Sequence, residues 1–122
     1  MMFPLHDAVH RGSVEDLELL LNKNNCDIEC KEDITKLTPL YLAVKKDFKA
    51  AVLILLTKGA KVNVTDAYAR TPLIYALDHC YIDLVECLIQ HGADVNQVDQ
   101  WDSTPLQTAV QHFDPGVKLL LD

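Results

Sequence analysis

The triplet Thr-Pro-Leu recurs in this chain at a fixed interval of 33 residues, beginning at Thr38, Thr71 and Thr104. The same interval relates an aspartate and an alanine in each copy: Asp33, Asp66 and Asp99; Ala43, Ala76 and Ala109. A single period that holds over several positions is the sequence signature of a repeat protein. The period therefore constrains the fold more strongly than any local signal does.

Each triplet combines the residues that begin an α-helix, because a threonine hydroxyl can cap the first turn and proline fits the first helical position. Apolar segments follow at 50–56 and 84–89, and Gly59 and Gly92 stand where a helix end needs positive φ. The second copy is expected to form two helices, 38–46 and 48–58. By propensity alone 52–56 could form a buried strand, but the repeat register favours a helix.

Applied to the whole chain, the period divides 122 residues into a single domain of four repeats, 1–32, 33–65, 66–98 and 99–122. The first copy is divergent, with a helix expected to start at Pro4 and end at Gly12. Two extra residues precede the second copy, and we place one at Asn24–Asn25 and one within 29–36. The fourth copy stops inside its second helix, so we expect a fragment of a longer array.

The composition disfavours several classes of partner. A net charge of −7 would repel a phosphate backbone, so nucleic acid is not expected. The longest apolar run, 50–56, is far shorter than the roughly 20 residues that span a bilayer. The N-terminus has neither a basic leader nor a cleavage site for secretion. We therefore expect no membrane insertion and a cytoplasmic, or nuclear, location.

Catalytic and metal-binding patterns are weak. The four cysteines lack zinc-site spacing and are expected to be free thiols. His6 and His10 share the spacing of a metalloprotease helix, but that motif needs a glutamate where Asp7 stands, and no third ligand follows. No glycine-rich phosphate loop is present, and neither Ser13 nor Ser103 has a nucleophile context. We expect no enzyme activity, no cofactor, no metal and no small-molecule substrate.

Together, the period, the initial aspartate, Thr-Pro-Leu-x-x-Ala, the leucine-rich second helix and Gly-Ala-Asp-Val-Asn at 92–96 resemble the ankyrin repeat. The resemblance covers essentially the whole chain. Two features depart from it. The turn glycine is replaced by Lys36, Ala69 and Asp102. The histidine after the triplet is replaced by Tyr41, Ile74 and Gln107, so that only His6 keeps the hydrogen-bonding role that this histidine usually has between repeats.

The resemblance implies an all-α solenoid of helix pairs joined by β-hairpin-like turns, and a protein or peptide partner bound at the hairpin tips and the concave helix face. Variable, outward-pointing positions are then the candidates for partner contact. In the hairpins these include Ile34, Ala67 and Gln100. The candidate binding residues are Thr35, Leu37, Lys45, Lys46, Tyr68, Arg70, Asp78, His79, Trp101, Ser103, Gln111 and His112.

Tyr68 and Trp101 occupy the same hairpin position one period apart. Exposed aromatic rings on a rigid edge favour partner contact, whereas rings that fold over the neighbouring hairpin would serve local packing. Both interpretations are open from the sequence. The leading function is a non-catalytic scaffold, and the alternative is the substrate-recognition part of a larger ubiquitin-ligase adaptor. Similarity to hydroxylated ankyrin repeats also makes Asn63 and Asn96 candidates for asparaginyl hydroxylation.

Overall fold

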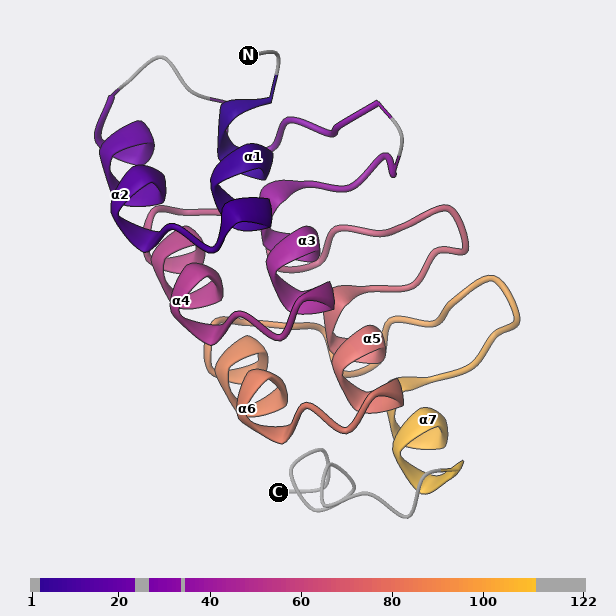
Figure 1. The fold of residues 1–122 in the computed structure, drawn as a ribbon. Coiled ribbons are helices and arrows are strands. Elements are labelled where there is room, and N and C mark those ends of the chain that lie inside the picture. Colours follow the sequence, from indigo (N-terminus) through magenta and orange to yellow (C-terminus); the bar gives the residue numbers. More distant parts are fainter. Residues whose placement is uncertain (1–2, 24–26, 34, 112–122) are drawn as a thin grey trace. The chain divides into compact units, whose positions relative to one another are not determined.

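The computed structural model describes residues 3–23, 27–33 and 35–111. Within these residues the chain forms seven α-helices and no β-strand (Figure 1). No helix in these stretches is long and apolar enough to cross a membrane. The elements group into two compact parts, an N-terminal part (residues 1–61) and a C-terminal part (residues 62–122).

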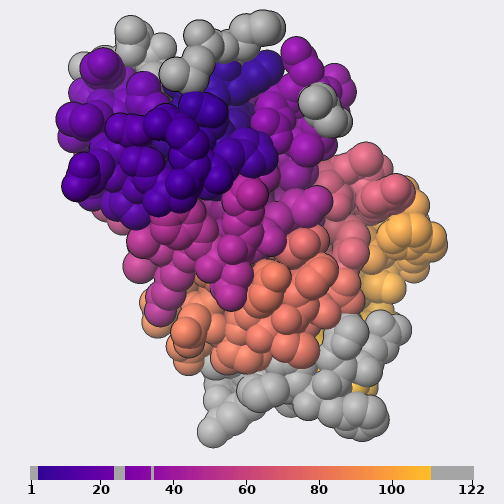
Figure 2. All heavy atoms as spheres, viewed as in Figure 1, coloured from indigo at the N-terminus to yellow at the C-terminus, as the bar shows by residue number. Residues whose placement is uncertain are grey.

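The N-terminal part contains two helix pairs. The first pair is α1 (Pro4–Arg11) and α2 (Val14–Asn22), and the second is α3 (Pro39–Lys45) and α4 (Lys49–Thr57). Helix α1 packs on α3 and α2 packs on α4, so like helices lie side by side. In Figure 2 the indigo side chains of the first pair meet the magenta side chains of the second. The segment 52–56 is helical, as the repeat register predicts.

The C-terminal part contains α5 (Pro72–Asp78), α6 (Ile82–Gln90) and α7 (Pro105–Gln111). Helix α5 packs against both α6 and α7. The second helix expected in the last repeat lies outside the described residues. In both parts the repeated alanine is fully buried, since a small side chain lets neighbouring helices approach closely: Ala8, Ala43, Ala76 and Ala109.

The Thr-Pro-Leu triplets start helices as the sequence predicts. The hydroxyl of Thr38 accepts a hydrogen bond from the Tyr41 N–H at 3.3 Å, and that of Thr71 accepts one from the Ile74 N–H at 3.2 Å. Thr104 makes the same bond to the Gln107 N–H at 3.1 Å. Each hydroxyl thus satisfies one of the N–H groups that a helix start leaves without a partner.

The helix ends are closed by main-chain hydrogen bonds. At the end of α3 the Asp47 N–H donates to the carbonyl of Val44 and the Phe48 N–H to that of Ala43, which is the Schellman arrangement. The corresponding bonds at the end of α5 come from Cys80 and Tyr81. In the first three repeats the residue that turns the chain after this helix has positive φ, and only the first of these residues is a glycine: Gly12 (71°), Asp47 (53°) and Cys80 (58°).

The first hairpin departs from the simple 33-residue register. In the C-terminal part the Asp66 N–H donates to the Arg70 carbonyl and the Asp99 N–H to the Ser103 carbonyl. In the N-terminal part the equivalent bond runs from the N–H of Glu32, rather than of Asp33, to the carbonyl of Leu37. One of the two extra residues therefore lies inside this hairpin, within the stretch where the sequence placed it. The other, at Asn24–Asn25, lies outside the described residues.

Candidate functional site

The two aromatic residues at the tips of neighbouring hairpins form a pair. The rings of Tyr68 and Trp101 stack with centroids 5.7 Å apart and planes inclined by 22°. The hairpins are also joined by a main-chain hydrogen bond, from the Gln100 N–H to the Tyr68 carbonyl at 3.0 Å. Even so, Tyr68 is 53% exposed and Trp101 is 62% exposed. The rings therefore pack on each other, as the local-packing interpretation expects, and both residues stay exposed, while their contact with a partner stays a prediction.

In the two hairpins of the C-terminal part, an aspartate at the base holds the tip in place. Oδ1 of Asp66 accepts hydrogen bonds from the N–H groups of Tyr68 and Arg70, each at 2.9 Å. Oδ1 of Asp99 accepts them from the N–H groups of Trp101, at 2.9 Å, and Ser103, at 3.0 Å. A carboxylate that binds two main-chain donors fixes the turn conformation. The aromatic pair is thus carried on a rigid main chain.

The hairpins keep a left-handed turn residue although the expected glycine is missing. Lys36, Ala69 and Asp102 have φ values of 61°, 59° and 60°. A side chain in this region costs free energy, because Cβ approaches the carbonyl oxygen, although aspartate tolerates the region better than most residues. The turn geometry is therefore retained at some cost in stability, and side chains remain where a glycine would offer none.

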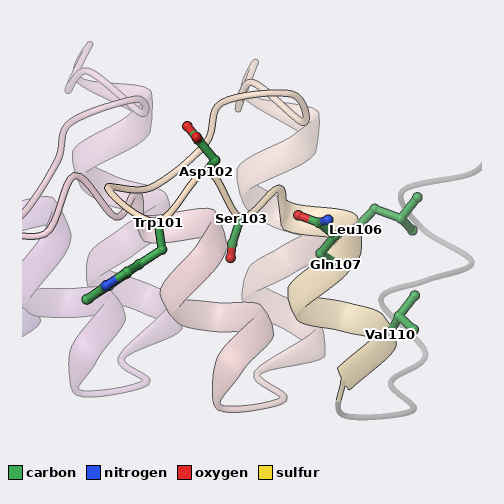
Figure 3. A pocket seen from close by; sticks show the side chains of 6 residues that line it. All are labelled: Trp101, Asp102, Ser103, Leu106, Gln107 and Val110. Carbon is green, nitrogen blue, oxygen red and sulfur yellow. The ribbon is translucent and has the colours of Figure 1, made fainter.

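An open hollow of about 470 Å³ lies beside α7 in the C-terminal part. It is lined by residues of the last hairpin and of the outer side of α7: Trp101, Asp102, Ser103, Leu106, Gln107 and Val110 (Figure 3). Asp102 is exposed, and Val110 is 51% exposed. In Figure 3 Trp101 and Asp102 leave the hairpin in different directions, while Leu106 and Val110 lie along the helix. The hollow thus combines a carboxylate with an apolar wall.

Three of the predicted residues meet at α5. Nη2 of Arg70, at the base of the hairpin, lies 3.2 Å from Oδ2 of Asp78 at the end of the helix, and both side chains are partly buried. His79 follows directly, with Nδ1 3.0 Å from the carbonyl oxygen of Tyr75 and its ring stacked on that of Tyr75 at 4.1 Å. Tyr81 completes the cluster, 5.6 Å from His79 between ring centroids.

Burial raises the pKa of the Tyr75 hydroxyl above its ordinary value of 10.0. The neighbouring phenol of Tyr81 and the carboxylate of Asp78 raise it further, and the guanidinium of Arg70 acts in the opposite direction. Tyr75 and Tyr81 are not among the residues predicted from the sequence. The signal for Tyr75 was its place four residues before His79, which puts both rings on one helix face.

In the N-terminal part the predicted residues divide into exposed and buried ones. Lys45 and Lys46 are exposed at the end of α3. Thr35 is exposed, and its hydroxyl donates to Oε1 of Glu32 at 2.7 Å. Leu37, by contrast, is only 3% exposed, so the expectation that it points outward is wrong. It directly precedes the helix cap Thr38, the position from which an apolar side chain packs against the first turn of the helix.

The corresponding residues of the next two hairpins, Arg70 and Ser103, are also partly buried. The position before the triplet is therefore buried in the first of these copies and partly exposed in the other two. Gln111 ends α7, and its side chain is not among those described. Ile34 and His112 lie outside the described residues. The structure thus brings together two exposed candidates, Tyr68 and Trp101. Asp102, which replaces the expected turn glycine, is their exposed neighbour.

His6 and His10 do not form a paired site. His6 is 1% exposed, and its Nε2 donates to the carbonyl of Leu37. His10 is exposed, and its Nε2 lies 3.5 Å from Oε2 of Glu32. Among the described residues, no three His, Cys, Asp or Glu side chains are grouped so that they could hold a metal ion.

The two asparagines considered for hydroxylation are both exposed. Oδ1 of Asn63 accepts a hydrogen bond from the Asp94 N–H at 2.8 Å, which links two neighbouring repeats. The Asn96 N–H donates to Oδ1 of Asp94 at 2.9 Å. Hydroxylation of either residue stays a prediction.

Comparison with known proteins agrees with this architecture. A family model described as ankyrin repeats (3 copies) matches residues 5–99 and also 66–122. The crystal structure of the ankyrin repeat domain of Bcl-3, described as a unique member of the IkappaB protein family, matches 86% of this chain with a TM-score of 0.82 and 31% identity. This chain covers 46% of that one, about half of its length. The all-α ankyrin-repeat fold expected from the sequence is confirmed.

Proposed function

Because this chain belongs to the ankyrin-repeat family, whose members generally act as protein-interaction modules, we propose that it is a non-catalytic scaffold that binds a partner protein or peptide through its hairpin tips. Tyr68 and Trp101 are the centre of this surface, and Arg70, Asp78 and His79 extend it toward the end of α5. The cytoplasmic or nuclear location expected from the sequence is part of the same proposal, and imaging of the tagged chain in cells tests it.

The observation that carries the proposal is the aromatic pair. Each of the two residues is more than half exposed, although burial of large aromatic side chains is strongly favourable. The Asp66 and Asp99 carboxylates and the Gln100 N–H hold the main chain on which the rings stand. A partner would therefore gain a large contact area without a large loss of side-chain entropy, which is typical of the residues that dominate binding energy at interfaces.

The test is affinity capture from cell extract followed by mass spectrometry, with the natural chain and the double variant Tyr68→Ala/Trp101→Ala as bait. We expect partners that the natural chain retains and the double variant loses. Leu19→Ala/Leu53→Ala is the matched control, because both leucines are exposed on second helices of the N-terminal part. Urea unfolding of all three baits verifies that each is folded. Equal capture by the natural chain and the tip variant would refute the proposal.

The same experiment addresses the adaptor alternative. A substrate-recognition part of a ubiquitin ligase would engage its substrate at the tips and the ligase elsewhere. In that case ligase subunits would be captured by both the natural chain and the tip variant, while the substrate would be lost with the tip variant.

A further inference from the structure

The charge of the chain is distributed unevenly between its two parts. Residues 1–61 contain nine Lys or Arg and nine Asp or Glu, which balance. Residues 62–122 contain two Lys or Arg and nine Asp or Glu, so the net charge of −7 arises entirely here. The aromatic pair and the hollow beside α7 both lie in this acidic part.

The described segment 62–111 has little positive charge to offset its carboxylates. Arg70 is its one Lys or Arg, and it lies against Asp78 at 3.2 Å. Seven Asp or Glu residues share this segment: Asp66, Asp78, Asp83, Glu86, Asp94, Asp99 and Asp102. Charges of one sign on a surface attract a partner of the opposite sign and repel one of the same sign. An acidic partner is therefore disfavoured at the tips.

The chemistry at the tips also favours a cation. The face of an aromatic ring carries partial negative charge, and tryptophan is the aromatic residue that attracts an ammonium or guanidinium group most strongly. The exposed side chains of Tyr68 and Trp101 can therefore contact a cation. Asp102 adds an exposed carboxylate directly after Trp101. Leu106 and Val110 supply an apolar wall in the adjoining hollow, against which the methylene stem of a Lys or Arg side chain can pack.

From the charge distribution and these contacts we infer that the tip surface, formed by Tyr68, Trp101 and Asp102 with the hollow beside α7, binds a basic segment of the partner. The inference rests on the proposed protein-binding function and specifies the chemistry of its partner. Trp101 and Asp102 point in different directions from one hairpin, so the segment carries more than one Lys or Arg. One basic side chain lies on the aromatic pair, and another reaches the carboxylate.

Binding can be tested with three fluorescein-labelled peptides of equal length that alternate alanine with arginine, glutamine or glutamate. Fluorescence polarisation against the whole chain gives the affinity. Trp101 is the only tryptophan, so a change in its emission on addition of unlabelled arginine peptide reports binding at the tip. The arginine peptide is expected to bind about tenfold more tightly than the glutamine peptide, and the glutamate peptide least. Raising the salt from about 0.05 M to about 0.5 M should weaken the arginine complex about fivefold or more.

Two variants locate the site. Tyr68→Ala/Trp101→Ala should weaken binding of the arginine peptide about fivefold or more, through loss of the ring faces. Asp102→Asn should weaken it about threefold. Asparagine also tolerates the positive φ of 60° at this position, so the hairpin conformation is kept. Glu86→Gln is the matched control, because it removes the same charge from the exposed side of α6 and should leave the affinity within about twofold.

The inference is overturned if the glutamine or glutamate peptide binds as tightly as the arginine peptide. It is also overturned if the arginine peptide binds equally to the natural chain and to both tip variants, since the acidic part would then attract it without a defined site. These outcomes differ from a failure of the proposed function, in which the tip variant captures the same proteins from cells as the natural chain. Tip-dependent capture of a partner that lacks basic segments would keep the scaffold function and reject the basic partner.

Discussion

Nε2 of His6 donates a hydrogen bond of 2.6 Å to the carbonyl oxygen of Leu37, 31 residues further along the chain. The imidazole is almost fully buried, and so is the Leu37 side chain. This bond joins the first helix of one repeat to the hairpin of the next. His6 therefore keeps the role that the resemblance assigned to this position.

Replacement of His6 by alanine should lower the free energy of unfolding by about 2–3 kcal/mol, because it leaves a buried carbonyl without its donor and opens a cavity. Urea unfolding measures the change. His10→Ala, at an exposed position in the same helix, should cost no more than about 1 kcal/mol. Similar losses for the two variants would show that the bond to Leu37 is not the cause.

Glycine at the left-handed turn positions should stabilise the chain. Lys36 and Ala69 have positive φ, so Lys36→Gly and Ala69→Gly remove a Cβ from an unfavourable conformation. We expect each substitution to raise the free energy of unfolding by about 0.5–1 kcal/mol. This figure already allows for the greater entropy that glycine gives the unfolded chain. Thermal and urea unfolding measure it. Glu86→Gly, inside α6, should instead lower the free energy of unfolding by about 1 kcal/mol. A loss of stability in both hairpin variants would contradict the prediction.

Asp99→Ala should loosen the last hairpin, since the Asp99 carboxylate accepts the N–H groups of both Trp101 and Ser103 while only 8% exposed. We expect the free energy of unfolding to fall by about 1–3 kcal/mol. Amide exchange at these two N–H groups should become faster. Asp94→Ala is the control, because its carboxylate accepts the N–H of exposed Asn96 and should cost less than about 1 kcal/mol. Unchanged exchange at Trp101 and Ser103 would show that Asp99 does not hold the tip.

The raised pKa of Tyr75 predicts a loss of stability at alkaline pH. The folded protein favours the neutral phenol, so this contribution is fully present below the ordinary value of 10.0 and is lost as the pH rises through the higher folded pKa. The difference in unfolding free energy between about pH 8 and about pH 11 should be smaller for Tyr75→Phe than for the natural chain. Tyr68→Phe, at an exposed ring, serves as the control. If Tyr75→Phe shows the same alkaline loss as the natural chain, the prediction is wrong.

The helix pairs could be predicted from the sequence because their determinants are local and repeated. Thr38 and Thr71 cap helices through their own hydroxyls, and Gly59 and Gly92 both take φ of 92° just after a helix. The first hairpin was less predictable, since its extra residue moves the closing hydrogen bond from Asp33 to Glu32. A fixed interval cannot show which residue an insertion displaces.

The candidate site was predicted in part. The shared position of Tyr68 and Trp101 selected both rings, but only the structure shows that they stack and stay exposed. Leu37 was assigned to the surface because hairpin residues vary between copies, whereas its burial follows from its place before a helix cap. From the sequence, Asp102 stands out only because it replaces the expected turn glycine. Its exposure beside Trp101 could not be predicted, because that exposure depends on the shape of the turn.

The Schellman bonds at the ends of α3 and α5 affect how the exposed surface at these helix ends can evolve. Main-chain N–H groups satisfy the last carbonyls, so the side chains of Lys46 and His79 are not needed to end their helices. Mutation and selection can exchange these side chains, and so alter the chemistry of the surface at the helix ends, without changing where each helix stops.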